Sequence, residues 1–275
     1  MIITNNEIDW LNQNYPGLAI EDISKSSILI RGNFKFKAAY NKLSGKYIIN
    51  PDNNYYSHPV IEDIYSIEIF SLLDLNTFPI IKNIDGRLLN LAKKLQLDSR
   101  DLHVYSGPIP EKNSLCVVGP IDIERIRGDI TLRILLENIL LPFFYDSSHY
   151  EKYGLKPRED YSHGVWGVLE NYYDIATNSI NSDKECLDKL MKHKEWLIIK
   201  KYLIGKNKPK GHHLCVVCMT DKIRKCHRKV FRALFKLHER IKAFNLNNYL
   251  QNNSSGTASD NFILNKLRIS DKSNV

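Results

Sequence analysis

The chain has 275 residues, of which 43% are hydrophobic and 25% charged, and it carries a formal net charge of +8. These proportions are those of an ordinary globular protein, and the length suits one or two domains with a sizeable core. No apolar run approaches the length of a membrane span, and residues 1–7 lack the basic-then-apolar pattern of a secretion signal. We therefore expect a cytoplasmic protein that does not enter a membrane.

Cysteine usage points the same way. The chain has five cysteines, an odd number: Cys116, Cys186, Cys215, Cys218 and Cys226. The last three lie within twelve positions. Secreted proteins rich in disulfides usually carry an even set spread along the chain. The pattern predicts metal binding together with free thiols.

The first half of the chain shows helix and strand patterns in an order typical of an α+β fold. An amphipathic helix is predicted over 7–15, with Asn5 or Asn6 as its N-cap. Alternating apolar residues then predict an antiparallel meander, with strands over 27–40, 46–49 and 61–73 and a loop over 50–59. A long loop carrying a cysteine follows the meander.

That loop, residues 103–120, opens on His103 and carries Cys116 between two apolar residues. Its turn residues Gly107, Pro108 and Pro110 keep the segment out of helix and strand. Considered alone, Cys116 could be a small buried hydrophobic residue, as most free cysteines are.

The order of the segments around Cys116 favours a functional role. An apolar stretch over 67–81 contains a Phe78-Pro79 turn, and a Gly86-Arg87 pair follows before His103 and Leu115-Cys116. Roughly residues 17–145 therefore resemble the ubiquitin-conjugating enzyme fold, and more closely its bacterial relatives of antiphage operons. The resemblance implies that Cys116 takes the C-terminus of a ubiquitin-like protein or a signalling nucleotidyltransferase from an activating enzyme as a thioester. It then transfers that group to a lysine of a target protein.

The same resemblance assigns roles to residues near Cys116. The thiolate is the nucleophile, and His103 and Lys112 could favour its formation. In eukaryotic members a His-Pro-Asn motif supplies an asparagine that stabilises the oxyanion. Here the chain reads His103-Val104-Tyr105, without that asparagine, so Asn113 or a backbone N–H would have to replace it.

Helical patterns dominate the middle of the chain. A strongly apolar helix is predicted over 132–141, capped by Asp129 or Thr131, ending near Pro142 and packed at the centre of the domain. Residues 88–97 could form a helix or an insertion beside the site, and another helix is predicted over 187–204. A Ser-His-Gly turn at His163 also resembles the bacterial family, and this histidine could be functional or cap the turn.

A second motif combines Cys215, Cys218, Cys226 and His227 within thirteen positions. Three thiolates and one imidazole fit a single tetrahedral structural zinc, whose coordination would fold the segment. The motif resembles the SEC-C zinc motif that bacterial relatives of conjugating enzymes carry. Its second cysteine falls one position late and the usual Gly-Ser-Gly is absent. His212 and His213 are spare ligands, and chance clustering of reduced cysteines is the alternative.

The positive charge is concentrated between Lys200 and Lys242, where a basic amphipathic helix is predicted over 230–244. This region could attract nucleic acid or an acidic protein surface, or be an ordinary solvated helix face. Two other functions therefore remain open: an inactive conjugating-fold binding module and a zinc-dependent nucleic-acid-binding protein. The predicted organisation is a conjugating-type domain, a helical extension, a zinc knuckle with the basic helix and a flexible tail, over 1–150, 151–205, 206–245 and 246–275.

Overall fold

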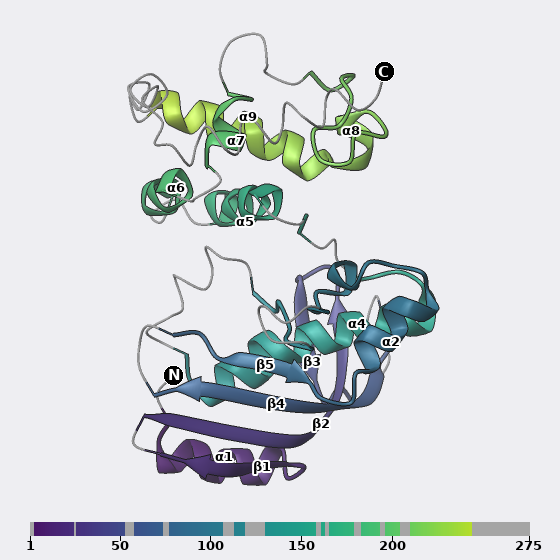
Figure 1. Ribbon diagram of the computed structural model, residues 1–275, viewed down its shortest axis with the longest axis vertical. Helices are drawn as coiled ribbons and strands as arrows, with labels where there is room; N and C mark the ends of the chain where they lie inside the picture. The colour runs from purple at the N-terminus through teal and green to yellow at the C-terminus, as the bar shows by residue number, and fades with distance from the viewer. Residues whose placement is uncertain are drawn as a thin grey trace. The chain divides into compact units, whose positions relative to one another are not determined.

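In the computed structural model the chain forms two compact units, Met1–His163 and Gly164–Val275 (Figure 1). The structure describes residues 3–24, 26–52, 58–73, 77–106, 113–118, 130–157, 161–162, 165–178, 183–192, 196–203 and 210–243. The predicted tail over 246–275 lies outside these residues, as do Lys112, Asp129 and His163.

The first unit is built on an antiparallel sheet, which confirms the predicted α+β class with flanking helices. Helix α1 precedes five strands: α1 Asn5–Asn14, β1 Leu18–Ile23, β2 Ser27–Asn41, β3 Lys46–Ile49, β4 Ile61–Leu72 and β5 Ile80–Asn83. The strand order is β1-β2-β4-β5, and β3 pairs with the far end of β2. Each neighbouring pair is antiparallel.

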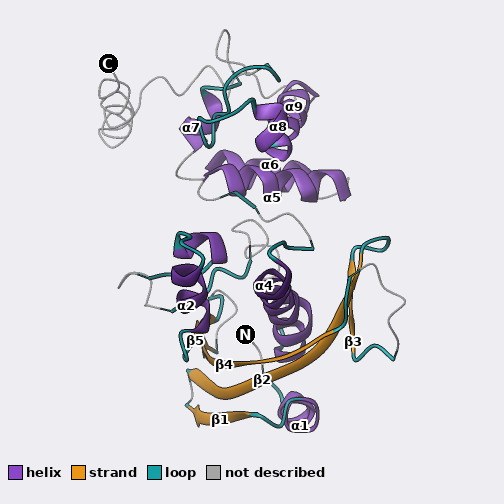
Figure 2. Cartoon of the chain, turned by 90° about the vertical axis from the view of Figure 1, so that its right-hand side faces the viewer, coloured by secondary structure: helices purple, strands orange, loops and turns teal. Residues whose placement is uncertain are grey.

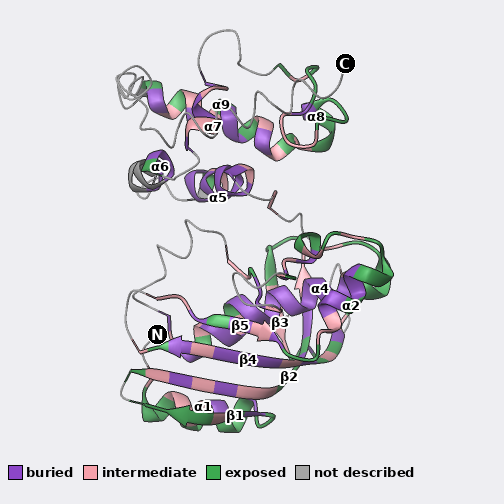
Figure 3. Ribbon diagram, viewed as in Figure 1, coloured by how far each residue is buried: buried purple, intermediate pink, exposed green. Residues whose placement is uncertain are grey.

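One face of this sheet forms the core. Alternate residues of β2 and β4 are buried, and the register places Phe34 opposite Tyr65. Helix α4 (Leu141–Tyr153) lies along this face (Figures 2 and 3). The ring of Phe144 on α4 stacks on Tyr65, with 4.3 Å between the ring centroids. The opposite face carries charged residues, with Glu68 between Arg31 and Lys82. Burial of one face therefore follows directly from the alternation in the sequence.

The N-terminal segment differs in two details from the sequence-based expectation. The N-cap of α1 is Thr4, whose Oγ1 accepts a hydrogen bond from Glu7 N at 3.3 Å, rather than Asn5 or Asn6. Strand β1 was not predicted, and it lies against β2 where two glycines meet. A Cβ on Gly32, whose φ is +143°, would stand 2.1 Å from the carbonyl oxygen of Gly17. Only glycine permits this approach of the two backbones.

The central helix does not end near Pro142, so that prediction was wrong. A hydrogen bond from Ile134 N to Thr131 Oγ1 (3.2 Å) caps its start, and a π-helical segment, η2 (Ile134–Leu140), runs directly into α4. A proline inside an α-helix lacks a donor and clashes with the carbonyl four residues earlier. The wider π turn accommodates Pro142 at the start of α4, and the helix continues to Tyr153.

Two short helices follow β5 in the first unit. Helix α2 spans Arg87–Lys94, in place of the helix or insertion expected at 88–97, and a 3-10 turn, η1, spans Ser99–Leu102. Four residues of α2 are buried against the core: Leu88, Leu89, Leu91 and Ala92. Helix α2 thus packs as part of the domain, and η1 leads the chain to His103.

The second unit is helical, with a hairpin before its last two helices. Its elements are α5 Val165–Asn178, α6 Asp183–Lys192, α7 Trp196–Lys200, α8 Ile223–Cys226 and α9 Arg228–Ala243. The single helix predicted over 187–204 is replaced by α6 and α7, with 193–195 outside the described residues. The basic helix predicted over 230–244 corresponds to α9, which packs against α5 and pairs Lys229 with Asp174 at 2.6 Å. In the part of the chain so described, no helix has the length and apolar character needed to cross a bilayer.

An ion-pair network at Arg87 joins three elements of the first unit. The guanidinium lies 2.8 Å from Asp63 Oδ2 on β4 and 2.7 Å from Glu151 Oε2 on α4, and it stacks over the ring of Tyr65. Ser148 Oγ donates to Asp63 Oδ2 at 2.7 Å. Burial alone would raise the pKa of Asp63, but the hydrogen bonds from Arg87 and Ser148 lower it below its ordinary value.

Substituting Arg87 by methionine is expected to lower the free energy of unfolding by about 2 kcal/mol, because it leaves the half-buried Asp63 carboxylate without its cation. The stabilisation by the Arg87–Asp63 ion pair is fully present above the ordinary Asp pKa of about 3.9. It is lost as the pH falls through the lowered pKa of Asp63 in the folded state. Urea unfolding at pH 7 and pH 3 measures both effects. The control is Arg100→Met, which removes an exposed pair with Asp98 and should leave the midpoint unchanged. Equal effects of the two substitutions would contradict the prediction.

Candidate functional site

The four predicted metal ligands come together in the second unit. One ligand atom from each of Cys215, Cys218, Cys226 and His227 can be chosen so that all lie within 4.8 Å of one another, close enough to hold a metal ion. These residues come from a hairpin and from the end of α8. The structure therefore brings together every metal ligand that the sequence predicted.

Local hydrogen bonds explain why the segment folds in this way. Cys215 N donates to Asp221 O at 2.7 Å, and Met219 N donates to Cys215 O at 3.0 Å, which closes a tight turn over 215–221. Met219 adopts a positive φ of 56°, a conformation that glycine usually occupies. Helix α8 then presents Cys226 and His227 to the turn. The turn and a single helical turn supply all four ligands.

Two of the separations within the cluster are close to those of a tetrahedral site. Zinc–sulfur and zinc–nitrogen bonds of about 2.3 and 2.0 Å imply separations of about 3.8 Å between two sulfurs and about 3.5 Å between sulfur and nitrogen. The sulfurs of Cys218 and Cys226 are 3.6 Å apart, and Cys215 Sγ is 3.3 Å from His227 Nδ1. Val217 N donates to Cys215 Sγ at 3.4 Å, a contact that stabilises a thiolate ligand.

The electrostatics of the three thiols also favour a cation. A hydrogen bond from the Thr220 hydroxyl to Cys218 Sγ, at 3.0 Å, is the main cause that lowers the pKa of Cys218 to about 6. Desolvation, followed by the proximity of Cys215 and Cys218, raises the pKa of Cys226 to about 12. Three thiolates this close repel one another, so a bound divalent cation would allow all of them to ionise.

The two spare histidines lie outside this cluster. The rings of His212 and His213 face each other edge to face with centroids 4.8 Å apart, and His213 Nδ1 accepts a hydrogen bond from Lys210 N. Among the described residues, the group that could hold a metal ion consists of the three cysteines and His227 alone.

Cys116 lies at the end of a short segment that extends the sheet of the first unit. Leu115 N donates to Ile81 O at 2.8 Å, and an isolated bridge pairs Lys82 of β5 with Ser114. On the other side Cys116 N donates to His103 O at 2.8 Å. The backbone around Cys116 is thus held from both sides, while the thiol is exposed. This excludes the alternative of a small buried residue.

The structure also places the two predicted helper residues near Cys116 along the backbone. His103 ends η1 with a positive φ of 54°, and its carbonyl group binds Cys116 N. Asn113 has a φ of 66°, donates its N–H to Tyr105 O and accepts a hydrogen bond from Asn83 N. The side-chain Oδ1 of Asn113 is buried and has no hydrogen-bond partner among the described residues. This oxygen can only accept a hydrogen bond, so an oxyanion would have to be bound by the Nδ2 group of the same amide.

Tyr105 is a site residue that the sequence did not identify. An isolated bridge between Val104 and Leu115 pairs the segment after η1 with the segment that carries Cys116. The side chain of Tyr105 interacts with the thiol across this pair, and burial first, then Cys116, raises the pKa of the phenol. Phenol and thiol therefore form a local pair. The one sequence signal for Tyr105 was the alternation around buried Val104. Because the chain lacks a His-Pro-Asn motif, this signal could not be assigned to a site residue.

Comparison of the chain with protein-family models, curated proteins and solved structures gives no match.

Proposed function

We propose that the first unit is a cysteine acyl carrier of the ubiquitin-conjugating type. It would take the C-terminus of a ubiquitin-like protein or signalling nucleotidyltransferase as a thioester on Cys116 and transfer it to a target lysine, in bacterial antiphage defence. The observation that carries the proposal is an exposed thiol on a backbone fixed by hydrogen bonds from two sides. A backbone held in this way orients the nucleophile and leaves it accessible to two large protein substrates.

The order of elements in the first unit supports this proposal. An N-terminal helix, an antiparallel meander, a loop with the cysteine and a buried helix follow one another as the resemblance implies. The segment with Cys116 lies beside the last strand, β5, so the thiol stands at an edge of the sheet rather than over its core. An incoming chain terminus could approach there without displacing core residues.

The residues around Cys116 suit two successive acyl transfers. The thiolate attacks the activated carbonyl carbon, a thioester forms and the leaving group departs with the activating enzyme. A lysine amine then attacks the thioester, and an oxyanion develops before the thiolate leaves. The Tyr105 hydroxyl can donate a hydrogen bond to the thiolate, and the Nδ2 group of Asn113, on the same segment as Cys116, is the side-chain candidate to donate to the oxyanion.

We further propose that Cys215, Cys218, Cys226 and His227 bind one zinc ion with a structural role. Three thiolates and an imidazole fill the four positions of a tetrahedral zinc, which leaves no open site for substrate. The chemistry that zinc supplies here is cross-linking of the hairpin to the start of α9. The separations within the cluster support this assignment.

The Tyr105→Phe variant tests the phenol–thiol pair without any partner protein. Removing a hydrogen bond to an anionic sulfur should slow alkylation of Cys116 by iodoacetamide at pH 7 about fivefold, since such a bond contributes about 1 kcal/mol. Mass spectrometry of the peptide with Cys116 measures the rate. Tyr153→Phe is the matched control, because Tyr153 is exposed and remote in sequence from the thiol. An unchanged rate in Tyr105→Phe would show that the phenol does not act on the sulfur.

A further inference from the structure

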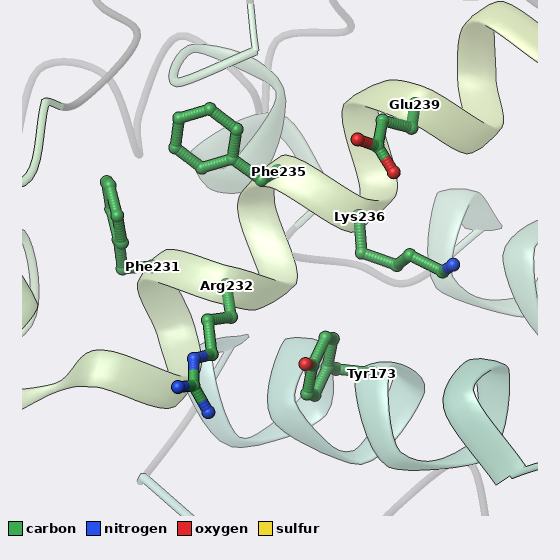
Figure 4. Close-up of a pocket in the computed structure, with 6 residues that line it drawn as sticks. All are labelled: Tyr173, Phe231, Arg232, Phe235, Lys236 and Glu239. Atoms are coloured by element: carbon green, nitrogen blue, oxygen red, sulfur yellow. The ribbon is translucent and has the colours of Figure 1, made fainter.

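A pocket unrelated to Cys116 and to the metal cluster opens along α9 in the second unit. Its volume is about 420 Å³, and it is lined by α5 and α9 through Tyr173, Phe231, Arg232, Phe235, Lys236 and Glu239 (Figure 4). The pocket combines aromatic rings with charged groups on adjacent turns of one helix. Aromatic and charged side chains together suit a ligand that has both a flat group and a charge.

The aromatic residues of the pocket lie outside the fully buried residues of the second unit. Helix α9 packs through a separate stripe, all of it buried: Val230, Ala233, Leu234, Leu237 and Ile241. The rings of Phe231 and Phe235 meet edge to face, with 4.9 Å between their centroids. Phe235 is nevertheless 39% exposed. A large apolar ring held by a neighbour and open to solvent is a surface on which a flat group can stack.

The cations of the pocket are available to a ligand. Lys229 at the start of α9 pairs with Asp174, whereas no carboxylate among the described residues forms a salt bridge with Arg232 or Lys236. These two residues lie one helical turn apart, a rise of about 6 Å. Helix α9 carries six basic residues and a single acidic one, Glu239. The field over the pocket therefore attracts anions.

We propose that this pocket binds single-stranded nucleic acid. An unpaired base stacks on the exposed ring of Phe235, and successive phosphates contact Arg232 and Lys236, which is how sequence-tolerant single-strand binders obtain affinity. An acidic peptide would use the cations, but its carboxylates have no flat face to stack on the exposed ring and no donor for Glu239. A nucleobase, in contrast, can donate its exocyclic amine to that carboxylate, as cytosine does. The proposal does not depend on the chemistry at Cys116.

The test uses the full chain and a fluorescent twelve-nucleotide oligodeoxycytidine, with binding followed by anisotropy over a range of salt concentrations. Phe235→Ala should weaken binding about tenfold, the effect of losing one stacked base. Arg232→Gln should also weaken it and reduce the slope of log K against log salt by about 0.7, since one phosphate contact is lost. Because both side chains are exposed, circular dichroism of these variants should match that of the unaltered protein.

Lys37→Gln is the matched charge control, because Lys37 is an exposed lysine on β2 in the other unit. It should leave the affinity and the slope unchanged. The proposal is overturned if the oligonucleotide does not bind at low salt, or if Phe235→Ala and Arg232→Gln bind as the unaltered protein does. Competition by polyglutamate as strong as that by unlabelled oligonucleotide would also overturn it, in favour of an acidic protein partner.

Discussion

The Cys226→Ser variant should lose its metal and the folded hairpin over 211–227. Serine is a poor zinc ligand, and apparent binding free energies of about 10–16 kcal/mol for structural zinc sites mean that coordination accounts for the folding of such segments. Cys226 is exposed, so little packing is lost with the sulfur and the effect is due to the metal. Elemental analysis should find one zinc per chain in the unaltered protein and almost none in the variant. Thermal unfolding should show the second unit melting earlier.

Two controls separate metal loss from a general effect of losing a thiol. Cys116→Ser removes an exposed cysteine outside the cluster, and His212→Ala removes a neighbouring imidazole that is not one of the four ligands. Both variants should keep the full metal content. Lowering the pH should release the metal, because thiolates and imidazole must lose their protons to bind. Purified protein without zinc, or a Cys226→Ser variant that keeps it, would rule out the assignment.

At Cys116 the expected result is the complete loss of a covalent adduct in the Cys116→Ala variant. Mixed with its activating enzyme, ATP and the carrier protein, the unaltered chain should form an adduct that reducing agent cleaves, because the bond is a thioester. Cys116→Ser should form an oxyester that survives reductant. Gels run with and without reducing agent distinguish the three outcomes.

Cys186 is the internal control for this experiment. It is only 1% exposed on α6, so its thiol is inaccessible to a protein substrate, and the adduct of the Cys116→Ala variant should not reappear there. A reductant-sensitive adduct that persists in Cys116→Ala would move the site to another cysteine. No adduct with any activating enzyme and carrier protein of this class would favour a conjugating-type fold that serves only as a binding module.

The parts of the fold that the sequence predicted well are those with a local or strictly periodic signal. The alternation around Phe34 and Phe36 predicted β2, because one face of the sheet is buried along its whole length. The metal cluster was predicted because its ligands lie within thirteen positions and one turn brings them together. Strand β1 was missed, since only Leu18 of its six residues is buried and a contact between two glycines supports it.

The remaining misses come from contacts distant in sequence or from unusual helical geometry. A proline normally ends a helix, so the sequence predicted an end near Pro142. The local pattern does not predict the π-helical segment that lets the helix continue to Tyr153. Tyr105 and Cys116 become neighbours only when the segments on either side of 107–112 pair. Side-chain partners of this kind depend on tertiary pairing and lie beyond pattern analysis.

The pairing of β1 and β3 with the same side of β2 has a consequence for solubility. The β1 register ends at Gly32 and the β3 register begins at Ala38, and hydrogen bonds from Asn33 to Gly17 and from Asn50 to Lys37 close the two ends of the interval. Lys35 lies midway, and among the described residues no backbone hydrogen bond joins it to β1 or β3, so a strand from another molecule could pair there. Its side chain is 62% exposed and forms an ion pair with Glu62. A charge at this position opposes edge-to-edge association, so the gap between two short strands need not become a starting point for aggregation.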